Sequence, residues 1–239
     1  MKASNKILLA VFLLAVLILA GIHVALYAKI KAADFASNDE LFFRKFHQQQ
    51  LPPTIKAVSI TGLWLCNLGN GTPSVSYLRE GVARLKINTR NDTVYIYAND
   101  WATKEDYERG IRNPYEVSLR IPENIPVRCE YGRLFLSGDP IPNQPPSFDL
   151  HLRCQSELIA MDWEPKQTVY FNKLQIVADS SSIELSSMNV INEMNIQATN
   201  ARLNYKHAEI KQQNLQIDDK TTIAATRKSL GNINFLPNQ

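Results

Sequence analysis

The sequence predicts an all-β protein with an N-terminal transmembrane helix, a short helical stalk, and β-strands that lead into a parallel β-solenoid with about 20 residues per turn. Three observations support this fold class. A long apolar segment lies near the N-terminus, short segments from residue 54 onward alternate apolar and polar residues, and apolar residues recur every twenty positions after residue 167. Alternation with period two is typical of half-buried strands.

The predicted membrane segment is residues 7–27, ILLAVFLLAVLILAGIHVALY, which contains no formally charged side chain. A helix of this length crosses a hydrocarbon core of about 30 Å. The alternative is a cleaved signal peptide, whose apolar region is usually about 7–15 residues long and ends at a small-x-small site. Cleavage after Ala25 or Ala28 would place His23 or Leu26 at position −3. We therefore interpret residues 7–27 as an uncleaved signal anchor.

Basic residues lie on both sides of the apolar segment, Lys2 and Lys6 before it and Lys29, Lys31, Arg44 and Lys45 after it. Long downstream domains are translocated largely regardless of their charge, so we assign the short tail to the cytoplasm. We expect a single-pass protein of the cytoplasmic (inner) membrane whose C-terminal domain is extracytoplasmic, in the periplasm. His23 lies near the end of the apolar segment, and we interpret it as a neutral interfacial histidine.

Residues 28–53 are predicted to form a helical stalk or linker. Ser37 and Glu40 match a capping box at the start of a helix, and Leu51-Pro52-Pro53 would end it, which predicts a helix over about 38–50. Its apolar stripe can dock on the following domain or lie on the membrane surface; the stripe consists of Leu41, Phe42, Phe43 and Phe46.

Residues 54–239 are predicted to form an extracytoplasmic all-β domain. Segments of alternating polarity are separated by clusters of turn-forming residues; they are ARLKI (83–87), TVYIY (93–97), YEVSLRI (115–121), RLFLS (133–137) and DLHLR (149–153). A polar stretch at 99–114 interrupts this pattern, and we interpret it as a surface insertion.

The segment from about 167 to 236 carries a repeat of about twenty residues. Pairs of apolar residues recur along it, and Ile183, Leu203 and Ile223 occupy equivalent positions. Helical solenoid repeats are usually longer than about 30 residues. We therefore expect each repeat to be one turn of a β-solenoid in which the apolar residues stack as internal columns. The period slips by one residue near Gln212–Asn214.

The corners of this solenoid require residues that tolerate a left-handed backbone, and no glycine occurs between Gly138 and Gly231. Asn and Asp tolerate that conformation best among the remaining residues. We expect the corners at Asp179, Asn189, Asn192, Asn200, Asp218 and Asp219. Asn192 or Asn214 can instead stack in an internal ladder or face solvent, and both alternatives stay open.

The charge balance excludes a nucleic-acid partner. Without the two lysines of residues 1–27, the chain carries 24 basic and 23 acidic side chains, so there is no basic footprint. Three cysteines, Cys66, Cys129 and Cys154, are compatible with a Cys129–Cys154 disulfide or with three free thiols. They are too dispersed for a metal site.

No motif for a catalytic site, a cofactor or a metal is present, so we expect no enzyme activity and no cofactor. Asp149 and His151 share a strand face, but no nucleophile accompanies them, and we interpret them as a surface pair. We interpret His207 as solvated. The three tryptophans can form a sugar-binding face or belong to the core; they are Trp64, Trp101 and Trp163. Two N-glycosylation sequons, at 70–72 and 91–93, are short enough to occur by chance.

The repeats resemble the auto-transporter adhesin family with a head GIN domain, which is common in Bacteroidetes. The similarity is carried by KLQIVADSSSIELSSMNVI, MNIQATNARLNYKHAEIK and NLQIDDKTTIAA, and it covers about 170–235 well and 54–165 weakly. The resemblance implies a cell-envelope β-solenoid, and no catalytic residues come with it.

These observations predict a membrane-anchored, non-catalytic β-solenoid that binds or scaffolds in the cell envelope, and the resemblance implies an adhesin-like role. Its partners are the membrane and a protein, glycan or lipid ligand. One alternative is a lipid- or glycolipid-handling β-groove protein, which would need an open apolar trough. The other is a carbohydrate-active enzyme, which would need converging carboxylates; the repeat region offers Glu184, Glu193, Glu209, Asp218 and Asp219.

Overall fold

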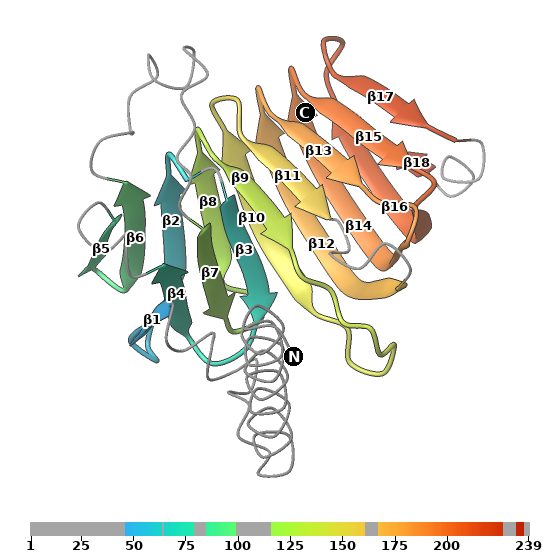
Figure 1. The fold of residues 1–239 in the computed structure, drawn as a ribbon. Coiled ribbons are helices and arrows are strands. Elements are labelled where there is room, and N and C mark those ends of the chain that lie inside the picture. Colours follow the sequence, from blue (N-terminus) through green and yellow to red (C-terminus); the bar gives the residue numbers. More distant parts are fainter. Residues whose placement is uncertain are drawn as a thin grey trace, which may run out of the picture. The chain divides into compact units, whose positions relative to one another are not determined.

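The computed structural model describes residues 46–63, 65–78, 85–98, 116–160, 167–226 and 233–236. These residues form two nine-stranded sheets that face each other as the two walls of a β-solenoid (Figure 1). The predicted anchor at 7–27 and most of the predicted stalk lie outside the described residues. Within the described ranges, no helix has the length and apolar character needed to cross a membrane.

Sheet A contains, in spatial order, β1 (Phe46–Gln50), β4 (Ser74–Leu78), β7 (Glu116–Ile121), β3 (Leu65–Asn70), β9 (Arg133–Leu136), β11 (Glu157–Ala160), β13 (Ser182–Leu185), β15 (Arg202–Lys206) and β17 (Thr222–Ala225). Sheet B contains β18 (Ile233–Phe235), β16 (Glu209–Ile217), β14 (Asn189–Thr199), β12 (Val169–Asp179), β10 (Ser147–Arg153), β8 (Pro126–Glu130), β2 (Ala57–Thr61), β6 (Thr93–Ala98) and β5 (Leu85–Arg90).

Each coil consists of one sheet B strand followed by one sheet A strand, and successive coils pair in parallel. Ile183 pairs with Leu203, and Leu203 pairs with Ile223, each twenty residues further along the chain. The side chains of Ile183 and Leu203 are buried, and Ile223 is partly buried at the end of the column. The predicted parallel β-solenoid is therefore confirmed, and its twenty-residue period is the length of one coil.

The solenoid extends further than the predicted 167–236. Leu134 pairs with Leu158, and Leu158 pairs with Ile183, which are spacings of 24 and 25 residues. The average turn is therefore about 23 residues. Corner loops of different lengths, such as the one at 138–146, lengthen these earlier coils and hide the period in the sequence.

One coil is not in sequence order. Strand β2 lies between β6 and β8 in sheet B, and β3 lies between β7 and β9 in sheet A. The first coil of the chain is therefore sandwiched between two coils that follow it. All four of these contacts are parallel, so the inserted coil keeps the geometry of the stack.

Antiparallel strands close the N-terminal end of the stack. Strand β4 pairs with β7, β1 pairs with β4, and β5 pairs with β6. β1 and β5 thereby become the edge strands of sheets A and B at this end, and both are short, with five and six residues, which limits pairing with other chains. The predicted helix over 38–50 is wrong at residues 46–50, which form β1. The open edge of β4 supplies hydrogen bonds that override the local helical pattern, and residues 38–45 lie outside the described residues.

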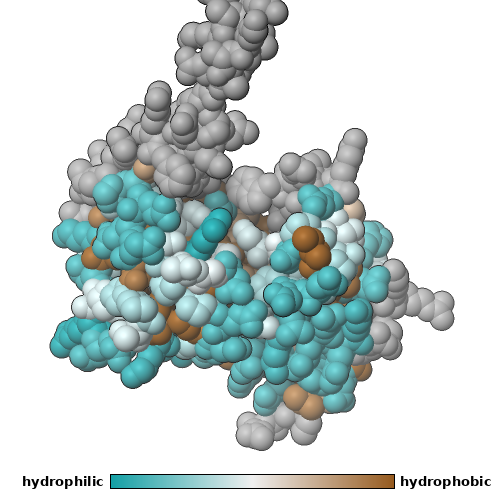
Figure 2. Space-filling model, turned by 90° about the horizontal axis from the view of Figure 1, so that it is seen from below, coloured by the Kyte–Doolittle hydropathy of each residue, from teal (hydrophilic) through white to brown (hydrophobic). Residues whose placement is uncertain are grey.

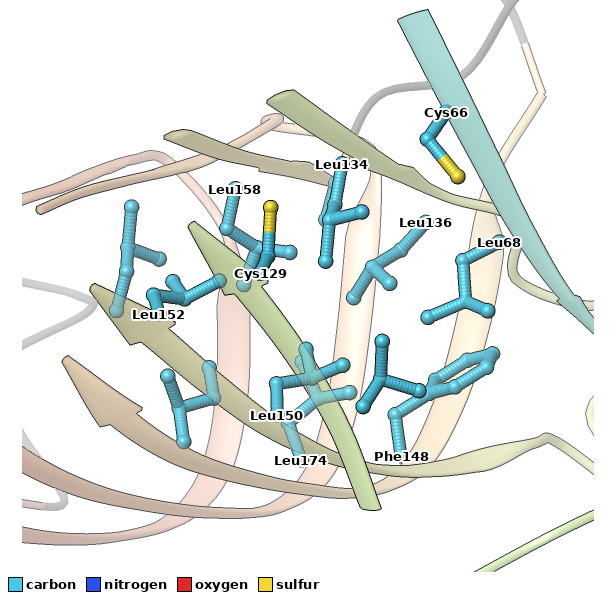
Figure 3. Packing of buried hydrophobic residues seen from close by; sticks show 14 of the residues in the cluster. Cys66, Leu68, Cys129, Leu134, Leu136, Phe148, Leu150, Leu152, Leu158 and Leu174 are labelled. Carbon is cyan, nitrogen blue, oxygen red and sulfur yellow. The ribbon is translucent and has the colours of Figure 1, made fainter. Parts of the chain in front are cut away.

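The interior is filled with apolar side chains from both sheets. Figure 3 shows Leu134 and Leu158 from sheet A and Leu150 and Leu174 from sheet B among these residues, and all four are fully buried. The rings of Phe148 and Phe171 pack at a centroid distance of 6.3 Å. The predicted columns are therefore closed, and they do not line an open trough.

All three cysteines are free thiols, so the Cys129–Cys154 disulfide does not form. Cys129 points into the core from β8, where it pairs in register with Leu152, and burial raises its pKa to about 12. Cys154 lies beyond the end of β10, at a corner with a φ of 54°, and its side chain is partly exposed. The solenoid register therefore separates these two residues.

The one-residue slip of the period lies at a corner rather than near Gln212–Asn214. Ser182 pairs with Arg202 at a spacing of twenty, whereas Val190 pairs with Glu209 at a spacing of nineteen. The shortened corner lies between β15 and β16, where Ala208 N donates to Tyr205 O at 2.9 Å. The following strand, β16, stays in register with β14 at this spacing. Gln213 therefore pairs with Met194 and lies in the same column as Met194 and Leu174.

Replacement of Leu203 by Ala tests the central column. Leu203 is fully buried, so the substitution leaves a cavity between two coils, and we expect unfolding to become easier by about 2–5 kcal/mol. Urea denaturation of the full chain in detergent, followed by far-ultraviolet circular dichroism, measures this change. Arg202→Ala, one residue earlier and exposed on the outer face, is the control and should change stability by less than about 0.5 kcal/mol. Equal losses in both variants would contradict the closed column.

Candidate functional site

The corners that connect sheet B to sheet A form one regular edge of the solenoid. Ser180 and Asn200 occupy equivalent corner positions in successive coils, and each has a φ of 51°. Backbone bonds join neighbouring corners, because Gln155 N donates to Ser180 O at 2.7 Å and Ser180 N donates to Thr199 O at 2.9 Å. The corners therefore stack as regularly as the strands do.

The prediction that Asn and Asp turn the corners is right for Asn200. Asp218 contributes through its side chain, which accepts a hydrogen bond from Asn200 N at 3.0 Å. Asn189 is buried at the opposite edge, where its Oδ1 accepts from Ser186 N at 2.7 Å. Three of the described repeat residues have the left-handed conformation: Asn200, which was predicted, and Ser180 and Lys206, which were not. It is absent at Asp179, Asn189, Asn192, Asp218 and Asp219.

Side-chain hydrogen bonds fix the corner that contains Asn200. Asn200 Nδ2 donates to Ser180 Oγ at 3.3 Å, and Ser180 Oγ donates to Asp179 Oδ1 at 3.0 Å. Thr221 Oγ1 donates to Asp218, and this bond, with that from Asn200 N, lowers the pKa of the Asp218 carboxyl. Asp218 is therefore ionised and engaged within the corner at neutral pH.

Two adjoining hollows lie along this edge and continue onto the outer face of sheet A. Their volumes are about 540 and 300 Å³, and they share Glu157, Ser182 and Arg202. We call them together the corner trough; residues that line it include Glu157, Ser180, Ser182, Asn200, Arg202 and Lys220. Most of these side chains are polar, so the trough favours polar ligands.

The carboxylates of the corner trough are already paired. Glu157 forms an ion pair with Arg133, and Glu184 forms one with Lys206. Arg202 and Lys220 have no acidic partner among the described residues. The trough therefore carries two cations whose charges no carboxylate of the described ranges neutralises.

The outer face of sheet B carries a ladder of side-chain amides. Gln175, Asn195, Asn214 and Asn234 are register partners in four successive strands. Asn214 Nδ2 donates to Asn195 Oδ1 at 2.7 Å, and Asn234 Nδ2 donates to Asn214 Oδ1 at 3.3 Å. Asn214 thus stacks in a ladder, but on the outside of the solenoid. Asn192 does not join the ladder, and its Oδ1 accepts from Lys211 Nζ at 2.8 Å.

The remaining residues singled out from the sequence do not form a common site. Asp149 Oδ1 lies 3.5 Å from His151 Nε2 on the outer face of sheet B, which fits the predicted surface pair. His207 is exposed. Within the described ranges, no group of three or more His, Cys, Asp or Glu side chains could hold a metal ion. The insertion at 99–114 lies outside the described residues, and so do the three tryptophans, Trp64, Trp101 and Trp163.

No family model and no curated protein matches the chain, so the family resemblance stays a prediction. Several solved structures are similar at low identity. A proposed adhesin from Parabacteroides merdae is 11% identical, with a TM-score of 0.41 over 72% of this chain and 81% of that one. A proposed adhesin from Bacteroides fragilis is 9% identical, with a TM-score of 0.36 over 80% and 92%. A proposed lipid-binding protein from Parabacteroides distasonis is 12% identical, with a TM-score of 0.36 over 81% and 97%.

Sequence reasoning did not find the corner trough. Its signal was present as Ser182, Arg202 and Thr222, which are spaced by twenty residues and pair in register on the outer face. Polar residues on an outer face add nothing to the apolar period of the sequence. The row is therefore recognisable only from the register of the stacked strands.

Substitution of Asn200 tests the backbone of the corner trough. Asn200→Ala and Asn200→Gly both remove the bond to Ser180, but only glycine adopts a φ of 51° without a steric cost. We therefore expect the Ala variant to be less stable than the Gly variant by about 1 kcal/mol. Urea denaturation of the full chain in detergent measures both. Equal stabilities would contradict the left-handed conformation of this corner.

Proposed function

We propose that the chain is a membrane-anchored, non-catalytic binding or scaffold protein of the cell envelope, whose solenoid acts outside the cytoplasmic membrane. The observation that carries this proposal is the closed solenoid. Its apolar columns are sealed between the sheets, whereas its outer faces present regular polar rows. Extended repetitive faces of this kind suit recognition of other surfaces and polymers.

The filled interior argues against the lipid-groove alternative. The residues that would have to line an open trough are instead packed in the core. Leu174, Ile183 and Leu203 have 0–1% of their surface exposed, and Ile217 is partly buried against this core. The hollows described above lie on the outside and are lined mainly by polar side chains. Figure 2, which shows the molecule from below, also presents a mainly hydrophilic surface with scattered hydrophobic residues. An acyl chain would find little apolar surface there.

The repeat-region carboxylates argue against the enzyme alternative. Glu184 lies on the outer face of sheet A, paired with Lys206, whereas Glu193 lies on sheet B, where Lys173 Nζ is 2.9 Å away. Asp218 is engaged at the corner by Thr221. Glycosidases need two carboxyl groups that flank one bond, at separations of roughly 5–10 Å. These three carboxylates are distributed over two sheets and a corner, and each has a structural partner.

Cys154 offers a test of the proposed orientation. It is partly exposed, whereas Cys66 and Cys129 are buried, and burial raises the pKa of both buried thiols. Only the thiolate reacts with maleimides. A membrane-impermeant maleimide should therefore label the full chain in intact spheroplasts, and Cys154→Ser should abolish the labelling. Labelling that appears only after lysis would place the solenoid in the cytoplasm and contradict the proposal.

Binding is tested with the full chain in nanodiscs, sedimented with isolated cell-wall polysaccharide and, separately, with envelope membranes. We expect saturable binding without shortening of the polymer, because Glu157 and Glu184, the two carboxylates that line the corner trough, are both held in ion pairs. Nanodiscs that carry residues 1–45 alone are the matched control and should not bind.

Native mass spectrometry of the full chain in detergent separates the alternatives. One tightly held lipid per chain would favour the lipid-groove protein, and shortened polysaccharide products would favour an enzyme. Failure to bind either envelope fraction would contradict the binding function itself.

A further inference from the structure

The most informative unassigned feature is the row of Ser182, Arg202 and Thr222 along the floor of the corner trough. These residues are direct register partners in β13, β15 and β17, so their side chains are about 4.8 Å apart on one face. Neither hydroxyl group makes a hydrogen bond with a described residue. Arg202 therefore lies between two hydroxyls that are available to a ligand.

The acidic side chains around this row are paired with other groups, so the positive charge of Arg202 is not neutralised. Glu157 is occupied by Arg133, and Glu184 is occupied by Lys206. Asp179 and Asp218 lie at the same corners but are engaged by Ser180, Thr221 and Asn200, and they do not line the trough. Lys220 adds a second unpaired cation at the end of the trough. An anionic ligand would therefore gain attraction without displacing a protein carboxylate.

The other groups of the trough fit a ligand rich in hydroxyls. The Asn200 amide donates to Ser180, which fixes its orientation and leaves Oδ1 as an acceptor. Hydroxyl and amide side chains at strand spacing can hydrogen-bond to several positions of an extended sugar polymer. The trough runs across successive strands, so a polymer lying along it would meet a new set of polar groups in each coil.

Other macromolecules fit this surface less well. A stable protein interface is centred on buried aromatic or aliphatic anchors. The large exposed hydrophobic residues of the described ranges lie elsewhere; they are Tyr95, Ile141, Phe235 and Leu236. Nucleic-acid binding requires a broad basic footprint, and here two unpaired cations stand among hydroxyl and amide groups and the ion-paired carboxylates of Glu157 and Glu184.

We propose that the corner trough binds an anionic polysaccharide, with Arg202 contacting its carboxylate, sulfate or phosphate groups and the flanking hydroxyls and amides contacting its sugar rings. This assignment rests on the proposed binding function and specifies its ligand class. Lys220 provides a second, weaker contact at the end of the trough.

The test measures binding of the full chain in nanodiscs of zwitterionic lipid to three polymers of matched length. Polygalacturonate presents carboxylates, dextran sulfate presents sulfates, and dextran is neutral. We expect at least one anionic polymer to bind and dextran to bind much more weakly. Arg202→Gln should weaken anionic binding about tenfold, as expected for loss of one charged hydrogen bond. Arg128→Gln is the matched control, because Arg128 is an exposed arginine on sheet B; it should change affinity less than twofold.

Several results would overturn the proposal. These are equal losses in Arg202→Gln and Arg128→Gln, equal binding of dextran, absence of binding to both anionic polymers, or tighter binding of duplex DNA. Thermal denaturation of both variants shows whether they stay folded. If binding to envelope fractions persists while neither anionic polymer binds, only the ligand assignment fails. If the envelope fractions also fail to bind, the proposed function fails with it.

Discussion

The contact between one coil and the next is the interaction on which the whole structure depends. A single coil contains two short strands and cannot exclude water from its inner faces, so it must pack against its neighbours. The column of Ile183, Leu203 and Ile223 shows the consequence, since each member is covered by the next. In-register pairing also satisfies the backbone of each strand. Most inner positions are therefore apolar, and this requirement generates the repeat that is visible in the sequence. Gln213, which is buried in the column of Leu174 and Met194, is an exception.

The stack of coils also has two ends, which differ in strand pairing and in burial. At the N-terminal end, β1, β4 and β5 pair antiparallel with their neighbours and so terminate the parallel stack. The β2–β3 coil is covered on both sides, because β6–β7 packs outside it. Towards the C-terminal end, burial decreases within the described residues, and 61% of the surface of Phe235 is exposed. The inserted coil and the antiparallel strands thus protect the N-terminal end of the core.

The predictable part of this fold was the part governed by the inner columns. The period of twenty identified the solenoid and its inward residues, because Leu203 and its equivalents are buried against apolar residues of the neighbouring coils. The insertion of β2–β3 was not predictable, since sequence order alone cannot indicate that a later coil packs on the outer side of an earlier one. The local pattern of residues 46–50 favoured a helix, and the free edge of β4 decided otherwise. The corner conformations also escaped prediction. Backbone hydrogen bonds between corners hold Ser180 in a left-handed conformation that its side chain does not prefer, and Lys206 in the same conformation donates its backbone N–H to Asn204 Oδ1.

The outer faces follow a different rule, and this explains why the candidate site was harder to predict than the core. An outward side chain contacts only its register neighbours and solvent. Whether a neighbour of opposite charge pairs with it therefore decides whether it is available to a ligand. In the row through sheet A, the charge of Glu157 is cancelled by Arg133 in the preceding strand, which leaves Ser182 as a neutral spacer before Arg202. An acidic residue at position 182 or 222 would neutralise Arg202 in the same way. Because both positions carry hydroxyls instead, the charge of Arg202 is not neutralised within its row, and the hydroxyl and amide groups of the trough lie beside it.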